Sequence, residues 1–214
     1  MDYRIGITGA QGSGKTTLAK YLDQYYGIPY LDAGVGKLMS DFGVKVGKEM
    51  PLFERLQVQM EIARHIEFIT RGVNGFVIDR TPADVVAYTL DLVGKTNDDN
   101  CIELAREIEM LCRRTSIANF NAIVGLRPGV EITQEDRARD QRGSLDPLYV
   151  SRIDALMCGE LTRILAMRHI GDLQIFMLSE NCISLESRAD IVMRTLNNIV
   201  QKIEHRITEH VTFH

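Results

Sequence analysis

The stretch that decides the fold is IGITGAQGSGKTTLAKYL, which runs from Ile5 to Leu22. Its middle part, Gly9–Thr16, fits the pattern G-x-x-x-x-G-K-[ST], with a short apolar run before it and helical apolar spacing after it. A dinucleotide-binding turn needs G-x-G-x-x-G, and the glycines of this segment cannot be aligned to that spacing. The segment therefore predicts a loop that holds the phosphates of a mononucleotide.

Each part of this loop has a physical task. Glycines let backbone N–H groups turn inward around phosphate oxygens, and the helix that follows adds the positive end of its dipole. Lys15 is expected to reach the β- and γ-phosphates of ATP, and the Thr16 hydroxyl is expected to bind Mg²⁺. The expected cofactor-binding residues are Gly9, Gly12, Ser13, Gly14, Lys15, Thr16 and Thr17.

Apolar runs and helical patterns alternate along the whole chain. Strands are expected at 3–8, 28–33, 76–80, 121–126 and 173–178, and helices at 15–26, 52–71, 147–168 and 184–206, with two more beginning near Pro82 and Asn97. This alternation predicts an α/β fold in three layers, in which helices cover both faces of a five-stranded parallel sheet. We expect one domain that spans residues 1–214.

Composition narrows the choice of partners and compartment. The net charge of −4 argues against a surface dedicated to nucleic acid or acidic lipid. No apolar run approaches the roughly 20 residues that a membrane-spanning helix needs. The cysteines form no C-x-x-C pair and are expected to be free thiols. Because MDYRIGITG leads directly into a strand, we expect no signal peptide and a cytoplasmic location.

Three classes of nucleotide-binding protein compete at this point. A motor ATPase would carry Asp-Glu after four apolar residues, but the apolar run from Phe76 is followed by Asp79 and Arg80. A GTPase would need an Asn/Thr-Lys-x-Asp guanine motif, and GKTNDD at 94–99 has similar letters in the wrong order. A phosphotransferase fits better, because it needs a proton acceptor for the attacking hydroxyl and cations for the transferred phosphoryl group.

Asp79 and Arg80 meet these two needs. Asp79 lies at the carboxyl end of a predicted strand, beside the loop, where it could act as the base, organise Mg²⁺ or only cap the helix near Pro82. Arg80 can stabilise charge on the transferred phosphoryl group. We expect catalytic roles for Lys15, Asp79 and Arg80, and metal-binding roles for Thr16 and Asp79.

The segment from about 127 to 146 is polar, without a clear period, and is predicted to be a lid. Its arginines are Arg127, Arg137, Arg139 and Arg142. An arginine-bearing loop that closes over ATP would exclude water and present guanidinium groups to the phosphates. The alternative is a solvated, charge-balanced loop, since acidic residues lie among the arginines. We expect catalytic roles for Arg137, Arg139 and Arg142.

These motifs resemble those of the small P-loop kinases of nucleosides and nucleotides. GAQGSGKTT at 9–17 matches their phosphate loop, and IDRTPADVVAYTL at 78–90 is similar to the Asp/Glu-Arg-Ser/Thr motif of deoxynucleoside kinases. The DRTP stretch and the Arg-rich segment are also similar to the AAA_28-like group, which includes ribosylnicotinamide kinase. The resemblance implies a three-layer P-loop NTPase fold with an Arg-rich lid, ATP and Mg²⁺ as cofactors, and Asp79 as the base with Arg80 beside it.

The resemblance also suggests substrate-binding residues. FERLQVQMEIARH at 53–65 is similar to the deoxynucleoside-kinase helix whose Phe and Gln contact the base. By this comparison Gln57 or Gln59 reads a base, with Arg64 or Phe53 nearby, although glutamine is commoner as a surface residue of such helices. Asp32 either binds a sugar hydroxyl or starts the next turn.

The sequence therefore predicts an ATP- and Mg²⁺-dependent kinase that acts on a small-molecule nucleoside or nucleotide. Two alternatives are a ribosylnicotinamide kinase and a kinase of a hydroxylated base in DNA, and the acidic net charge disfavours the second. An alternative of another class is a P-loop ATPase or switch that regulates a partner. The long amphipathic helices leave room for a homodimer.

Overall fold

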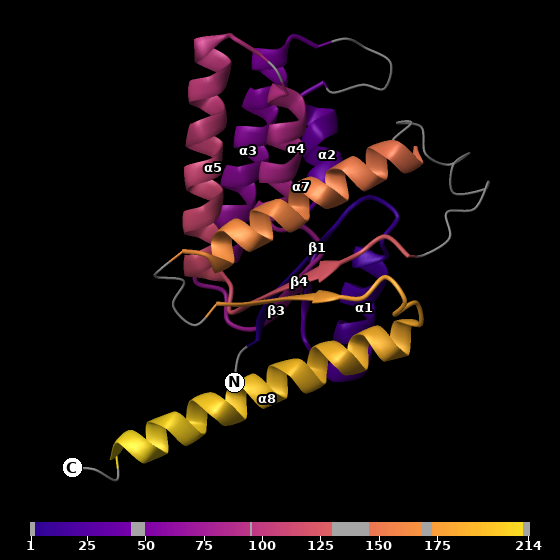
Figure 1. The fold of residues 1–214 in the computed structure, drawn as a ribbon, viewed down its shortest axis with the longest axis vertical. Coiled ribbons are helices and arrows are strands. Elements are labelled where there is room, and N and C mark those ends of the chain that lie inside the picture. Colours follow the sequence, from indigo (N-terminus) through magenta and orange to yellow (C-terminus); the bar gives the residue numbers. More distant parts are fainter. Residues whose placement is uncertain (1–2, 44–49, 95, 130–145, 168–172, 212–214) are drawn as a thin grey trace.

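A parallel sheet runs through the middle of the molecule (Figure 1). The computed structural model describes residues 3–43, 50–94, 96–129, 146–167 and 173–211, with side chains as far as residue 198. Within these residues the sheet has five strands in the order β2-β3-β1-β4-β5, with β1 (Arg4–Gly9) at the centre. The predicted α/β fold with a five-stranded parallel sheet is confirmed.

The strands next to β1 bring later parts of the chain beside the glycine-rich loop. β3 (Phe76–Ile78) and β4 (Ala122–Leu126) flank β1, while β2 (Tyr30–Leu31) and β5 (Gln174–Leu178) form the edges. Both β2 and β3 are shorter than the predicted 28–33 and 76–80. β2 is an edge strand that pairs with β3 through only two residues. The chain leaves the sheet after Ile78, so Asp79 and Arg80 lie just beyond its carboxyl edge.

Helices cover both faces of the sheet (Figure 1). The helices α1 (Lys15–Tyr26) and α8 (Leu185–Val211) lie on one face, and α3 (Leu52–Thr70), α4 (Pro82–Val93), α5 (Asp99–Asn119) and α7 (Pro147–Leu165) lie on the other. α7 ends three residues before the predicted 168, and α8 extends past the predicted 206. None of the helices in the described part of the chain is both long enough and apolar enough to cross a bilayer.

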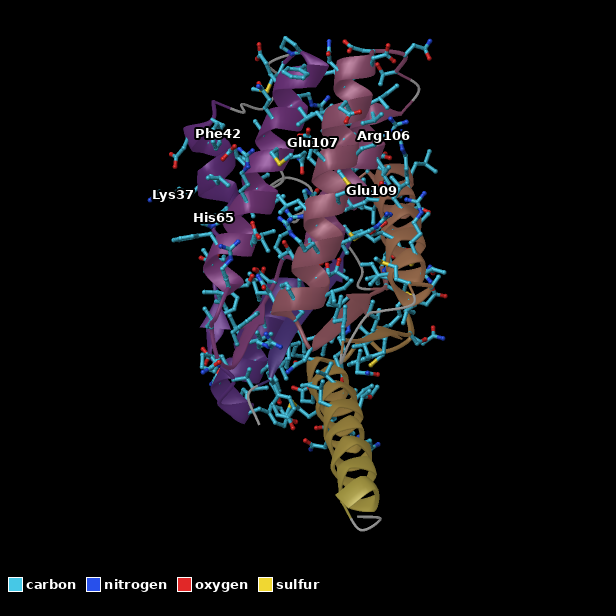
Figure 2. The ribbon with its side chains drawn as sticks, turned by 90° about the vertical axis from the view of Figure 1, so that its left-hand side faces the viewer. Lys37, Phe42, His65, Arg106, Glu107 and Glu109 are labelled. Carbon is cyan, nitrogen blue, oxygen red and sulfur yellow. The ribbon has the colours of Figure 1, made fainter. Side chains whose placement is uncertain are left out.

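A short helix, α2 (Val35–Asp41), was not predicted from the sequence. It begins after Gly34 and has only seven residues, too few to show a helical period. His65 of α3 lies beside it, with its Nε2 atom 3.1 Å from the carbonyl oxygen of Ala33. Lys37 and Phe42 are exposed at this side of the molecule (Figure 2).

Strand side chains alternate between two apolar cores. On β3, Phe76 and Ile78 face α3, α4 and α5, whereas Val77 faces α1 and α8. A parallel sheet buried on both faces needs such continuous apolar strands. At Gly6 of β1 a Cβ atom would lie 2.6 Å from the Thr81 Cγ2 atom. Glycine therefore lets the segment after β3 cross close to the central strand.

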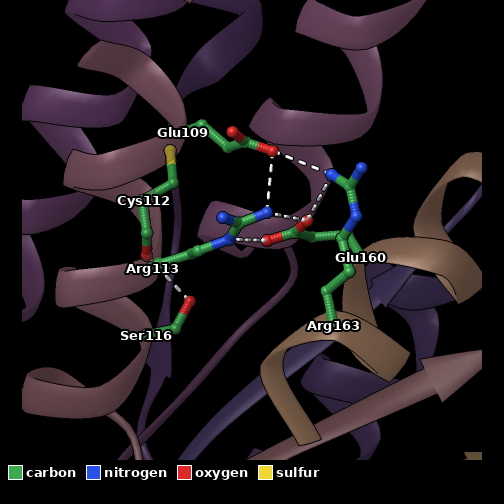
Figure 3. A network of polar contacts seen from close by, with 6 residues as sticks. All are labelled: Glu109, Cys112, Arg113, Ser116, Glu160 and Arg163. Atoms are coloured by element: carbon green, nitrogen blue, oxygen red, sulfur yellow. Dashed lines mark hydrogen bonds and ion pairs between the residues drawn. The ribbon is translucent and has the colours of Figure 1, made fainter. Parts of the chain in front are cut away.

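An ion-pair network joins α5 to α7 (Figure 3). The buried Glu160 carboxylate accepts hydrogen bonds from Arg113 Nε at 2.9 Å and Arg113 Nη2 at 3.0 Å. Glu109 accepts from Arg113 Nη2 at 2.7 Å and from Arg163 Nη1 at 2.8 Å. Because these contacts cross between helices, the network fixes α7 against the rest of the helical layer.

Replacing Glu160 should destabilise the fold strongly. A Glu160→Leu variant leaves the half-buried Arg113 without its main carboxylate, and we expect the free energy of unfolding to fall by about 3 kcal/mol in urea titrations. The matched control is Glu103→Leu, because Glu103 forms an exposed pair with Arg106 at 3.8 Å, and its removal should cost less than about 1 kcal/mol. Equal losses in the two variants would contradict this account of the network.

Candidate active site at the carboxyl ends of β1 and β3

The glycine-rich loop lies between β1 and α1, in the strand–loop–helix context that its motif requires. Gly14 caps α1 with a φ of 86°, a left-handed conformation that glycine adopts without strain. At Gly9 a Cβ atom would lie 2.6 Å from the Leu126 carbonyl oxygen of the neighbouring strand. These two positions therefore need glycine for different reasons, one for backbone conformation and one for close packing.

Lys15 lies in the first turn of α1 and folds back over the loop. Its Nζ atom donates to the carbonyl oxygens of Gly9 at 2.6 Å and Ala10 at 3.0 Å. Burial lowers the pKa of Lys15 to about 8, and the nearby Asp84 carboxylate partly opposes this change. The ammonium group is therefore held among loop carbonyls, at the place where the sequence predicts phosphate oxygens.

The lowered pKa of Lys15 predicts a pH dependence of nucleotide binding. Bound phosphates would keep Lys15 protonated, whereas the free protein loses this proton as the pH rises through about 8, so the affinity should fall above that pH. For a non-hydrolysable ATP analogue we expect roughly tenfold weaker binding at about pH 9 than at about pH 7.5, measured by calorimetry. A Lys15→Arg variant stays charged and should not show this fall. A flat profile for the wild type would contradict the prediction.

Asp79 and Thr16, the predicted metal-binding pair, are in direct contact. The Thr16 hydroxyl donates to Asp79 Oδ2, and the Tyr30 hydroxyl donates to the same oxygen at 3.0 Å. The contact joins α1, β2 and the end of β3. A hydroxyl and a carboxylate beside a phosphate loop fit Mg²⁺, which takes oxygen ligands from one or two carboxylates and from substrate phosphates.

Asp79 does not cap the helix that follows it, so that alternative is wrong. The N-cap of α4 is Thr81, which forms a capping box with Asp84. Asp84 Oδ2 accepts from the Thr81 backbone N–H and from its hydroxyl, each at 2.8 Å. The carboxylate of Asp79 is therefore left to its contacts with the phosphate-loop helix and Tyr30.

Arg80 points toward α4. Its Nη1 atom lies 3.7 Å from Asp84 Oδ1, and its guanidinium carbon lies 5.2 Å from the centre of the Tyr88 ring. Among the described residues, buried polar atoms here and in the phosphate loop lack a hydrogen-bond partner: Arg80 Nη1, Asp84 Oδ1, Tyr88 OH, Gln11 Oε1 and Ser13 Oγ. Because buried polar atoms are normally hydrogen-bonded, such a group beside the phosphate loop can accommodate a polar ligand.

The chain matches the model of a known protein family. The AAA_28 model, described as an AAA domain, matches residues 4–164, which is more than half of the chain. The chain belongs to the AAA_28 family. The matched span of this AAA_28 domain includes the phosphate loop, Asp79 and Arg80, and α7 up to Ile164.

Solved structures of a deoxyadenosine kinase from M. mycoides have a similar fold. The structure with the products dCMP and a flexible dCDP matches with a TM-score of 0.64 at 13% identity, covering 91% of this chain and 98% of that chain. The structure with dCTP gives 0.63 at 12% identity with the same coverage. The structure with dATP gives 0.59 at 16% identity, covering 90% and 98%. The AAA_28 domain therefore has a fold like that of P-loop small-molecule kinases.

The predicted substrate residues on α3 lie on two different faces of the helix. Phe53, Gln57 and Arg64 are exposed, and Arg64 is paired with Glu61 at 2.6 Å. Gln59 is half-buried and lies on the opposite side, on the stripe that holds Leu56, Ala63 and Ile66. Of the four residues, only Gln59 is therefore directed toward the interior.

Asp32 starts a turn, which was one of its two predicted roles. Its Oδ1 atom accepts from the Gly34 backbone N–H at 2.9 Å, just before α2 begins. This is the pattern of an Asx turn, which leads the chain out of β2.

The predicted lid lies almost wholly outside the described residues. Arg137, Arg139 and Arg142 fall in the segment 130–145, so their predicted roles stay predictions. Arg127, at the end of β4, donates from Nε to Asp154 Oδ2 of α7 at 2.9 Å. Burial raises the pKa of Asp154, and the Arg127 guanidinium opposes this effect. The pair ties β4 to the helix that follows the Arg-rich segment.

The structure adds Tyr30, Asp84 and Tyr88 to the candidate site. The sequence carries a signal for Asp84, because Thr81-Pro-Ala-Asp84 has the spacing of a capping box before an apolar run. It carries no signal for Tyr30, whose contact with Asp79 depends on the pairing of β2 with β3. Tyr88 lies two helical turns after Arg80 and is placed by the start of α4.

Proposed function

We propose that the protein is an ATP- and Mg²⁺-dependent kinase that transfers the γ-phosphoryl group of ATP to a hydroxyl of a nucleoside or nucleotide. The contact of Asp79 with Thr16, directly followed by Arg80, carries this proposal. A motor ATPase would have a glutamate in the place of Arg80 to polarise a water molecule. Here that place holds a cation, which suits a phosphoryl group in transfer.

The roles of the loop residues follow from their positions. Loop N–H groups and Lys15 would bind the β- and γ-phosphates, and Thr16 and Asp79 would hold Mg²⁺. Bound Mg²⁺ neutralises charge on the phosphate oxygens. Because Asp79 Oδ2 already accepts two hydroxyl donors, we favour the metal-organising role of Asp79 over the role of base. Arg80, with Arg137, Arg139 and Arg142, would stabilise the transferred phosphoryl group.

Charge pairing between α4 and α7 favours an uncharged acceptor. Arg152 of α7 pairs with Asp91 of α4 at 2.7 Å, so this cation is already neutralised. An acceptor phosphate would have to compete with the Asp91 carboxylate for Arg152, whereas a neutral hydroxyl would not. We therefore favour a nucleoside over a nucleotide as the acceptor.

Aromatic side chains near Arg80 and the phosphate loop favour an acceptor that contains a planar ring. Tyr88 and Tyr149 pack together with the loop residue Ala10. Burial raises the pKa of Tyr149 to about 12, and Arg55 of α3 lies near enough to oppose this change. Gln59 follows Arg55 by one turn, so the two residues lie on neighbouring positions of one side of α3. A base stacked on the tyrosine rings would be within the same region as the Gln59 amide.

A panel of acceptors tests the proposal. Purified protein with ATP and Mg²⁺ is incubated with deoxynucleosides, ribonucleosides, nucleoside monophosphates, ribosylnicotinamide or DNA containing a hydroxylated base. The molecular masses of the products are then measured by mass spectrometry. We expect ADP together with one phosphate added to a nucleoside. Transfer to ribosylnicotinamide or DNA alone would support the corresponding alternative. ATP hydrolysis without any phosphorylated acceptor would contradict the kinase and favour an ATPase or switch.

A further inference from the structure

Arg188 is a buried cation at the start of α8, far along the chain from the phosphate loop. Its side chain is 3% exposed. Ala189 and Val192 of α8 pack with Leu18 and Leu22 of α1, so α8 lies along the helix that follows the loop (Figure 1). This packing brings the first turn of α8 to the first turn of α1.

We propose that Arg188 is a positioning residue that fixes the phosphate loop in its binding conformation and raises its affinity for polyphosphate. The proposal rests on the phosphate-binding part of the proposed function. Arg188 Nη1 donates to the Ser13 carbonyl oxygen at 2.7 Å, and Arg188 Nε donates to the Cys182 carbonyl oxygen at 2.6 Å. The guanidinium therefore joins the phosphate loop to the segment between β5 and α8.

The bond to Ser13 determines how the next peptide group is oriented. The Ser13 carbonyl and the Gly14 N–H belong to one trans peptide, in which they point in opposite directions. When Arg188 holds the carbonyl, the Gly14 N–H is directed away from α8, toward the side of the loop where phosphates would bind. A cation on the carbonyl oxygen also polarises the peptide and strengthens its N–H as a donor.

Glycine at position 14 makes this contact possible. A Cβ atom there would lie 3.2 Å from Arg188 Nη1, and the φ of 86° already disfavours any side chain. The loop backbone and the guanidinium therefore approach each other closely at a residue whose N–H would contact phosphate.

The charge of Arg188 should matter as much as its hydrogen bonds. Both partners are neutral carbonyls, and among the described residues Arg188 forms no ion pair with a carboxylate. A buried cation without a counter-ion is costly, and that cost falls when a polyanion binds nearby. Arg188 should therefore increase binding of the polyphosphate part of the nucleotide and have little effect on the nucleoside part.

The test compares Arg188→Met and Arg188→Lys with the wild type. Two probes are titrated by calorimetry with Mg²⁺ present: inorganic tripolyphosphate and a non-hydrolysable ATP analogue. We expect Arg188→Met to bind both probes more weakly than the wild type by the same factor, about ten- to a hundredfold, because a charge-assisted hydrogen bond is lost. Arg188→Lys keeps the charge and should recover part of the affinity. The matched control is Arg194→Met, which removes one exposed positive charge from the same helix and should change binding by less than about twofold.

Three results would overturn the proposal. The first is an unchanged affinity of Arg188→Met for tripolyphosphate, and the second is weaker binding of the ATP analogue alone. The third is equally weak binding of the probes in Arg188→Met and Arg188→Lys, together with an equal drop in the melting temperature of the two ligand-free variants. Failure of the wild type to bind either probe would instead disprove the phosphate site itself. Normal probe binding without any phosphorylated acceptor would disprove only the kinase activity, and the inference about Arg188 would stand.

Discussion

A Lys15→Met variant is expected to lose phosphoryl transfer by about 10²- to 10³-fold while keeping its fold. The Lys15 ammonium is held at the Gly9 and Ala10 carbonyls, in the loop that would bind phosphate. Methionine fills a similar volume but has no charge to place on the transferred phosphoryl group. The desolvation cost of the ammonium disappears together with its two hydrogen bonds, so we expect the free energy of unfolding to change by less than about 1 kcal/mol.

The measurement is initial rate at saturating ATP and acceptor, with circular dichroism to confirm folding. Lys37→Met is the matched control, because Lys37 is an exposed residue of α2 on the side of the molecule shown in Figure 2. Its rate should equal that of the wild type. A Lys15→Met protein that keeps more than about a tenth of the wild-type rate would rule out the role given to Lys15.

An Asp79→Asn variant should also lose about 10²- to 10³-fold in rate and should need more Mg²⁺ to reach its maximum. The amide oxygen of asparagine can still accept from Thr16 and Tyr30, so the local structure should persist. It is a weaker Mg²⁺ ligand because it carries no charge. Titrating Mg²⁺ at fixed ATP measures both effects in one experiment.

The Mg²⁺ titration separates the two roles that the sequence leaves open for Asp79. A lower rate with a raised Mg²⁺ requirement supports metal organisation, whereas a lower rate with an unchanged requirement supports a base. Asp23→Asn serves as the control, since Asp23 has an exposed side chain on the same helix as Thr16. Unchanged rate and unchanged Mg²⁺ requirement in Asp79→Asn would contradict both roles.

The phosphate loop and the helix after it could be predicted closely because their signals are local. The expected helix at 15–26 matches α1. A single motif specifies the residues expected to bind phosphate, the turn that they form and the residue at which the helix begins. The contact between Thr16 and Asp79 was also predictable, because both residues follow strands whose carboxyl ends meet at one edge of a parallel sheet. The lengths of β2 and β3 were overestimated, because apolar composition does not show where pairing ends.

Contacts between distant parts of the chain could not be predicted in the same way. Tyr30 reaches Asp79 only through strand pairing, and Arg188 reaches Ser13 only because α8 packs along α1. The helical period of α3 already separates Gln59 from Gln57, which lie about 200° apart around the axis. Resemblance to another helix did not distinguish them, whereas burial does.

Following the γ-phosphoryl group of radiolabelled ATP tests the proposed kinase activity most directly. Chromatography separates the labelled acceptor from labelled inorganic phosphate, and the amount of label in each is measured. The reaction is run with and without the preferred nucleoside acceptor from the panel. We predict that the acceptor receives nearly all of the transferred label and that little inorganic phosphate forms without it. Release of the label as inorganic phosphate at the same rate with and without acceptor would contradict a kinase.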